Sequence, residues 1–206
     1  MGLISDGTTM FDAGAMASGF GGSMTFIKKL TASGSGTLSF VDGSASVVLD
    51  STYKEYIFTF NNVHPASADA NLQINFSIDA GSNYNVAKTT SFFRTQHGES
   101  GSGGELGYET GLDLAQATAV QKISQTSGAD NDQAISGILH LFNPSSTTFA
   151  KHFISQTNVS YAYSEPYFYS SWVAGYANTT SAIDAVQFSI NSGNMDTGDI
   201  CLYGIS

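Results

Sequence analysis

The segment from residue 71 to residue 79 alternates apolar and polar side chains without a break. Its apolar positions are Leu72, Ile74, Phe76 and Ile78. Its polar positions are Asn71, Gln73, Asn75, Ser77 and Asp79. Successive side chains of a β-strand point to opposite faces, so this alternation is typical of a half-buried antiparallel strand. We therefore expect one face of residues 71–79 to pack on a core while the other meets solvent.

A second feature is the stretch 137–155, in which two apolar, aromatic-rich runs flank the sequence Asn-Pro-Ser-Ser-Thr-Thr. Asn143 readily bonds its own backbone and Pro144 presets φ, so both residues favour a reversal of the chain. The flanking Ile, Leu and Phe residues pack well on a pleated surface. The stretch therefore predicts a long antiparallel hairpin.

Short strand patterns recur along the rest of the chain. They lie at residues 24–32, 37–41, 47–49, 53–63, 88–96, 186–190 and 200–205. In the segment 53–63, Tyr56, Phe58 and Phe60 share one face. Short strands at regular spacing, separated by turn residues, predict an all-β fold, an antiparallel β-sandwich that is jelly-roll-like.

Two loop features interrupt these strands. Asp42-Gly43 is a strong signal for a hairpin turn. Residues 97–132 are the least regular part of the chain, and a long excursion of this kind is usually a functional or exposed loop. Within it, apolar residues recur near helical spacing over residues 112–125, which allows a short helix there although the match to the helical period is poor.

Residues 1–23 differ from the rest, because glycine is dense there and the apolar residues keep neither helical nor strand period. The large apolar residues are Leu3, Ile4, Met10, Phe11, Met16 and Phe20. A disordered terminus is one interpretation. An unattached tail rarely carries so many large apolar residues, so we favour an arm that becomes ordered on a neighbouring subunit. The expected organisation is an extended N-terminal attachment arm at residues 1–23 and a β-sandwich domain at residues 24–206.

The charge balance excludes one class of partner. The chain has 7 Lys and Arg against 17 Asp and Glu, a formal net charge of −10, and its basic residues are scattered. Such a chain repels phosphate backbones, so nucleic-acid binding is not expected.

Cys201 is the single cysteine, so the fold does not depend on a disulfide. No apolar run approaches the ~20 residues of a membrane helix and the N-terminus lacks a basic region, so we expect neither membrane insertion nor a signal peptide.

Nucleophile and metal patterns are sparse. No Gly-x-Ser-x-Gly elbow occurs in the chain. His140 and His152 lie opposite each other if the hairpin turns around Ser146, close enough to share an ion or a hydrogen bond. Two ligands do not make a metal site without a third, so paired or partly exposed strand histidines are the favoured interpretation. Neither a metal site nor a cofactor is predicted.

Oxygen-bearing side chains gather in two places. Asp130 and Asp132 flank Asn131, which suggests calcium, but adjacent residues point in different directions and a turn or a strand cap is favoured. An acid pair for glycoside hydrolysis would come from Glu99, Glu105, Glu109 and Asp113. These acids lie in the glycine-rich excursion, where we expect solvated carboxylates and no catalytic residue.

Aromatic residues crowd together after the central hairpin. Those considered for binding are Tyr161, Tyr163, Tyr167, Tyr169 and Trp172. Aromatic faces stack on sugars and tyrosine adds a hydroxyl, so a groove lined this way would hold a surface glycan. Tyr and Trp are also enriched in subunit interfaces, and an interface or core role is the favoured interpretation.

Five motifs occur in order along the chain. They are Phe26-Ile-Lys-Lys-Leu-Thr-Ala-Ser, Tyr56-Ile-Phe-Thr-Phe-Asn-Asn-Val-His-Pro65, Leu139-His-Leu-Phe-Asn-Pro-Ser-Ser-Thr-Thr-Phe-Ala-Lys-His-Phe153, Ala174-Gly-Tyr-Ala-Asn-Thr-Thr-Ser-Ala-Ile183 and Ile200-Cys-Leu-Tyr-Gly-Ile205. Through them the chain resembles, from about residue 24 to its end, structural proteins of tailed bacteriophages of marine bacteria, cyanobacterial phages among them. The resemblance implies a virion component, either a tail or fibre protein or a head decoration. It implies capsid or tail subunits as partners and no catalytic residues.

Three hypotheses follow for function. The favoured one is a non-enzymatic virion structural protein, a homo-oligomer and by analogy a trimer, assembled in the host cytoplasm and attached to the outer surface of head or tail through its arm. The second is a receptor-binding module that recognises host surface glycans through the aromatic group. The third is a polysaccharide hydrolase, which requires a rigid acid pair that the sequence does not display.

Overall fold

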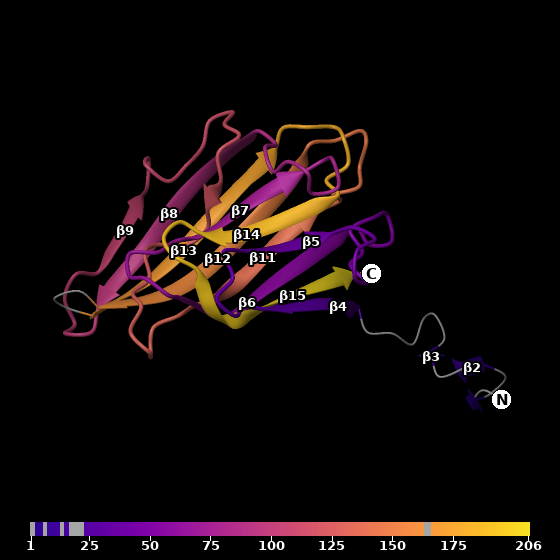
Figure 1. Cartoon of the computed structure of the whole chain (residues 1–206), viewed down its shortest axis with the longest axis horizontal. Coiled ribbons are helices and arrows are strands. Elements are labelled where there is room, and N and C mark those ends of the chain that lie inside the picture. The colour runs from indigo at the N-terminus through magenta and orange to yellow at the C-terminus, as the bar shows by residue number, and fades with distance from the viewer. Residues whose placement is uncertain (1–2, 6–7, 13–14, 17–22, 163–165) are drawn as a thin grey trace.

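The structure, a computed structural model, describes residues 3–5, 8–12, 15–16, 23–162 and 166–206 (Figure 1). Strands account for 55% of the chain and the described residues contain no helix. The predicted all-β fold is confirmed. The short helix considered for residues 112–125 does not form, because this segment holds only β10 (Gln121–Lys122) between turns.

Two antiparallel sheets pack on each other (Figure 1). The eight-stranded sheet has the order β4 (Met24–Thr31), β15 (Met195–Ile205), β6 (Glu55–Pro65), β11 (Ile135–Phe142), β12 (Lys151–Ala162), β13 (Pro166–Ala177), β8 (Lys88–Gly98) and β9 (Glu105–Tyr108). The four-stranded sheet has the order β10, β7 (Leu72–Ser77), β14 (Ala185–Ile190) and β5 (Thr37–Val41). The chain crosses repeatedly from one sheet to the other, as in the jelly-roll-like sandwich that the strand patterns predict.

Three short strands lie within the predicted arm. They are β1 (Leu3–Ser5), β2 (Thr8–Asp12) and β3 (Ala15–Met16), and they form a sheet of their own. Strand pairing therefore occurs where the residue pattern indicated none. Five of the six predicted attachment residues lie in these strands, whereas Phe20 lies outside the described residues.

Phe188 of β14 lies at the centre of the core between the sheets. Its ring centroid is 5.2 Å from those of Phe58 and Phe60 in β6 and 6.2 Å from that of Phe40 in β5, all in edge-to-face geometry. Such aromatic pairs contribute about 0.5–1.5 kcal/mol beyond the burial of their area. Tyr56 is fully buried with Phe58 and Phe60, so the predicted shared face of these residues is confirmed.

The central hairpin is confirmed, but the other predicted hairpin is wrong. β11 and β12 pair in antiparallel register, and Asn143 turns the chain with a φ of 47°. Asp42-Gly43 also forms a turn, with Gly43 at a φ of 72°. However, the strand before it belongs to the four-stranded sheet and the strand after it to the eight-stranded sheet. The turn therefore carries the chain across the sandwich instead of pairing neighbouring strands.

Strand β7 differs from its prediction because it is buried on both faces. The apolar side chains pack in the core, and Gln73, Asn75 and Ser77 on the opposite face are at most 7% exposed. Ile78, predicted on the core face, lies past the strand end and is 43% exposed. The alternation thus marks a strand with a core face and a buried polar face.

The polar face of β7 is buried because two loops, around residues 84 and 118, cover it. Asn75 Nδ2 donates to the carbonyl oxygens of Tyr84, at 2.6 Å, and Thr118, at 3.3 Å. Gln73 Oε1 accepts from the hydroxyl of Ser189 at 3.3 Å. Buried polar groups need such partners, and the loops around residues 84 and 118 supply them. The excursion at residues 97–132, predicted as an exposed loop, is therefore partly a buried covering layer.

Lys88 lies within this polar layer and is fully buried. Its Nζ donates to Asn75 Oδ1 at 2.6 Å and to the carbonyl oxygen of Val86 at 2.8 Å. Both partners are neutral, so no opposite charge offsets the cost of removing the ammonium from water. Burial accordingly lowers the pKa of Lys88 to about 8.

This shift predicts a pH dependence of stability. The unfolded-state pKa of lysine is about 10.4, so the folded state binds the proton less tightly, and the free energy of unfolding should rise by about 2 kcal/mol between about pH 7 and pH 10. Lys88→Met, which removes the titrating group and keeps much of its volume, should abolish that rise. Urea titrations of both proteins at several pH values measure it. Parallel pH profiles for the two proteins would contradict a buried lysine that titrates near pH 8.

Candidate functional site

The structure divides the predicted aromatic group between two faces of the eight-stranded sheet. Tyr161 pairs with Tyr167 across β12 and β13, and these two side chains share their face with Tyr169. Trp172 is opposite Gln156 and points to the other face, which lies away from the core. Tyr163 lies outside the described residues. The five residues therefore do not line a single groove.

The face that carries Trp172 is unusually apolar, and we call it the outer face. Six large side chains from strands across the sheet define it: Phe26, Ile57, Ile138, Ile154, Trp172 and Phe93. Phe26 is 57% exposed and Ile154 is 48% exposed. Trp172 stacks on Phe93 with ring centroids 5.4 Å apart and planes 9° from parallel. Ile57 is buried at 7% exposure, but exposed apolar side chains grouped on one face, as the others are, are typical of an interaction site.

A trough of about 360 Å³ lies in the middle of the outer face. It is lined by Ile138, His140, Phe142, Ile154, Gln156 and Trp172. Phe26 stands to one side of it, on the edge strand, and packs edge-to-face on Tyr203 with centroids 5.6 Å apart. The outer face thus presents both a depression and a protruding aromatic side chain.

Two carboxylates on the outer face have partners within the chain. The carboxylate of Glu55 contacts His140 Nδ1 at the border of the trough. At the far margin Lys29 Nζ lies 3.2 Å from the carboxylate of Asp199, which also accepts from the hydroxyl of Thr31. These bonds lower the pKa of Asp199. The outer face therefore adds little unbalanced charge to a strongly acidic chain.

The predicted pairing of His140 with His152 is wrong. His140 is opposite Ile154, because the hairpin turns around Thr147 and not one residue earlier. The ring of His152 instead lies 5.9 Å from that of Tyr176. A shift of one residue at the turn centre moves every cross-strand partner by two. Among the described residues, no group of three or more His, Cys, Asp or Glu side chains is placed to hold a metal ion.

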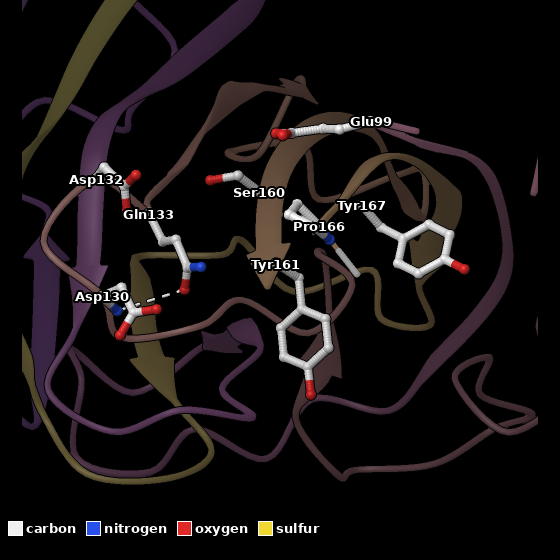
Figure 2. Close-up of a pocket in the computed structure, with 8 residues that line it drawn as sticks. All are labelled: Glu99, Asp130, Asp132, Gln133, Ser160, Tyr161, Pro166 and Tyr167. Carbon is white, nitrogen blue, oxygen red and sulfur yellow. Dashed lines mark hydrogen bonds between the residues drawn. The ribbon is translucent and has the colours of Figure 1, made fainter. Parts of the chain in front are cut away.

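A second depression lies at one end of the large sheet, and we call it the acidic hollow (Figure 2). It measures about 260 Å³ and is lined by Glu99, Asp130, Asp132, Gln133, Ser160, Tyr161, Pro166 and Tyr167. These residues come from the end of β8, the turn before β11, the end of β12 and the start of β13. Two of the predicted aromatic residues therefore meet the two aspartates considered for calcium, which the sequence did not link.

The turn that bears Asp130 is held from two sides. The backbone nitrogen of Gln133 donates to the carbonyl oxygen of Asp130 at 2.8 Å, so the predicted turn is confirmed. His64 Nε2 lies 3.1 Å from the same carbonyl, and His64 Nδ1 lies 2.8 Å from the carboxylate of Asp196. Burial lowers the pKa of His64, but these two acceptors outweigh burial and raise it above the usual value.

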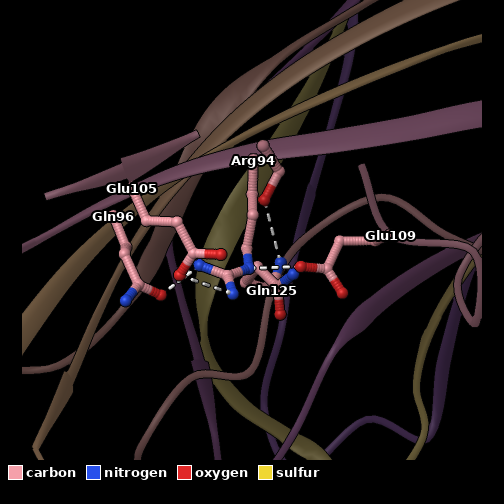
Figure 3. Close-up of polar contacts among 6 residues, drawn as sticks. Arg94, Gln96, Glu105, Glu109 and Gln125 are labelled. Atoms are coloured by element: carbon pink, nitrogen blue, oxygen red, sulfur yellow. Dashed lines mark hydrogen bonds and ion pairs between the residues drawn. The ribbon is translucent and has the colours of Figure 1, made fainter. Parts of the chain in front are cut away.

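Two of the candidate hydrolytic acids are held by one arginine (Figure 3). Arg94 Nε contacts the carboxylate of Glu109, and its Nη2 lies 3.5 Å from that of Glu105. The guanidinium also lies 5.5 Å from the ring centroid of Tyr169, whose pKa is raised by burial. Since their oxygens are already engaged, Glu105 and Glu109 form a structural ion-pair cluster.

The other two candidate acids are separated from that cluster. The carboxylate of Asp113 accepts the hydroxyl of Tyr108 at 2.7 Å. Glu99 lines the acidic hollow. The four candidate acids therefore lie in three separate places: the ion-pair cluster at Arg94, the contact with Tyr108 and the acidic hollow.

No protein-family model matches the chain, and neither does any curated protein or any solved structure. Among the described residues there is no helix with the length and apolar character needed to cross a bilayer.

Sequence reasoning missed the outer face, although a signal was present. Residues 138–142 are Ile-Leu-His-Leu-Phe, a run that does not alternate. Consecutive large side chains in a strand place bulky groups on both faces of the sheet. In β11 the inward residues Leu139 and Leu141 fill the core while Ile138 and Phe142 line the trough.

The contacts of His64 predict a pH effect on stability. Both ring nitrogens face acceptors, so the protonated ring makes both bonds. The stabilisation should be complete below the unfolded-state pKa of about 6.5 and should be lost as the pH rises through the higher folded-state value. The difference in melting temperature between the wild type and His64→Gln should therefore be larger at about pH 5.5 than at about pH 8.5. Equal differences at the two pH values would indicate a neutral ring.

Proposed function

We propose that this chain is a non-enzymatic structural subunit of a bacteriophage virion that assembles with copies of itself through its outer face. Two observations support the proposal. The five sequence motifs resemble structural proteins of marine tailed phages. The outer face gathers several large apolar side chains on one surface of an acidic chain.

The size of the outer face suits a stable interface. Eight strands spaced by about 4.8 Å span about 34 Å, and the 8 residues of β11 rise by about 3.3 Å each, so the sheet offers about 900 Å². A standard protein interface buries about 800 Å² on each partner. The outer face is therefore large enough for one.

Charge favours a second copy as the occupant. Two chains with a net charge of −10 repel each other unless they meet through surfaces that carry little charge. The trough of the outer face meets this condition because no Asp, Glu, Lys or Arg of the described residues lines it, and at the margin of the face Asp199 pairs with Lys29. It also presents a trough and, to one side of it, the exposed ring of Phe26, so the trough of one copy can receive an aromatic side chain of the next in a head-to-tail contact that closes into a ring. By analogy with phage appendages the assembly is a trimer.

The N-terminal arm provides the attachment in this proposal. Its apolar residues, Leu3, Ile4, Met10, Phe11, Met16 and Phe20, would lie on capsid or tail subunits at the outer surface of the head or tail. An arm with six large apolar residues suits burial on a partner better than a solvated tail does. The sandwich would then be positioned at the particle surface.

A charge placed on the outer face should prevent self-association. Ile154→Asp sets an unpaired carboxylate beside the trough, which should weaken association at least about tenfold. The matched control is Phe149→Asp, because Phe149 is 69% exposed but lies in the loop between β11 and β12. Sedimentation velocity over a concentration series compares the variants with the wild type.

The result expected is a monomer for Ile154→Asp and an oligomer for both the wild type and the control. Circular dichroism shows whether each variant keeps its fold. An oligomer of the same size in all three proteins would contradict assembly through the outer face, and so would a wild type that remains monomeric.

Deletion of residues 1–22 should separate folding from attachment. The sandwich should keep its melting temperature, because its core lies in the later strands, but the truncated chain should no longer enter the particle. Mass spectrometry of purified particles from complemented infections measures incorporation. Incorporation equal to that of the full chain would contradict an attachment role for the arm.

A further inference from the structure

One side-chain amide at the acidic hollow has a donor with no acceptor among the described residues. Gln133 is only 5% exposed, and its Oε1 accepts from the backbone nitrogen of Asp130 at 3.4 Å. Its Nε2 donates to none of the described residues and points toward Ser160 and Tyr161 (Figure 2). Nε2 is not one of the buried unpaired atoms, so it stays accessible from the hollow, and a group that enters the hollow can accept a hydrogen bond from it.

The charge of the lining limits what that group is. Glu99, Asp130 and Asp132 contribute carboxylates, and no Lys or Arg is among the lining residues. A phosphate, sulfate or carboxylate ligand would be repelled. These acids are also not gathered as ion ligands, since the described residues hold no group of three metal-ligating side chains.

The mixture of donors and acceptors narrows the ligand further. An ammonium group would satisfy the carboxylates but leave Gln133 Nε2 without an acceptor. Sugar hydroxyls both donate and accept, so they would serve the carboxylates, the amide nitrogen and the hydroxyl of Ser160 together. A neutral polyhydroxylated ligand is therefore the one that satisfies every polar group in the hollow.

The aromatic residues of the hollow are held in place before any ligand arrives. The hydroxyl of Tyr161 donates to Asp69 Oδ1 at 2.7 Å. Tyr167 stacks on Tyr169 with ring centroids 6.1 Å apart and planes 29° from parallel. Rings fixed in this way offer faces for stacking without a further loss of conformational entropy on binding.

We propose that the acidic hollow binds one neutral pyranose residue of a surface glycan, with Gln133 Nε2 donating to a sugar hydroxyl and the carboxylates accepting from others. The volume agrees with this ligand. About 260 Å³ lies below the about 300–1,000 Å³ of drug-sized pockets, which leaves room for one sugar ring and not for an enclosed oligosaccharide. The site is independent of the proposed assembly and goes beyond a structural role.

Gln133→Glu provides a sharp test because it keeps the shape of the side chain and the oxygen that faces Asp130 while removing the donor. The probes are the methyl glycosides of glucose, galactose and mannose, applied singly to the full chain at millimolar concentration. Saturation-transfer NMR detects binding and titration gives the affinity. The wild type should bind at least one of them, and Gln133→Glu should weaken that binding at least about tenfold.

The controls separate this site from the outer face. Gln156→Glu makes the same chemical change in the trough and should leave sugar binding unchanged. Ile154→Asp should also bind as the wild type does, even if it fails to assemble. Asp132→Asn, which changes the hollow without touching Gln133, should weaken binding as well. Binding of none of the three glycosides by the wild type, or equal binding by the wild type and Gln133→Glu, would overturn the inference.

Discussion

The packing of Phe188 against Phe40, Phe58 and Phe60 is the interaction on which the architecture depends. It joins β14 and β5 of the small sheet to β6 of the large one, so both sheets keep a fixed distance and register. Once the inner face of the large sheet is occupied in this way, alternation forces the intervening side chains outward. The outer face is thus a direct consequence of the core, and its apolar character is not needed to fold the sandwich.

Buried polar side chains of this protein find their hydrogen-bond partners in two different ways. Asn75 and Lys88 satisfy each other and nearby carbonyl oxygens in a closed layer. Gln133 is equally buried, yet its amide nitrogen opens onto the acidic hollow. The contrast shows that this one amide donor stays accessible at the surface of the fold, where a group from outside can accept from it.

Alternation in the sequence was enough to predict the all-β sandwich, the central hairpin and the buried face of β6. It could not show that the polar face of β7 is covered, because alternation within a strand does not indicate which loops fold back over that strand. The hairpin predicted at Asp42-Gly43 does not form, because the sequence of a turn does not specify which sheet the next strand joins. Tyr169 and Trp172 are an odd number of residues apart in one strand, so their side chains point to opposite faces, and this spacing alone divides the aromatic group. The acidic hollow could not be predicted, because it joins four segments that only the tertiary structure brings together.

The central claim is that the outer face is buried between copies, and Trp172 offers the most direct measurement of it. Trp172 is the single tryptophan of the chain and lines the trough, so fluorescence reports this surface alone. Emission and acrylamide quenching should be followed as the protein concentration rises. The account predicts a shift to shorter wavelength and weaker quenching as copies associate. Unchanged emission and quenching across a range in which the protein oligomerises would contradict it.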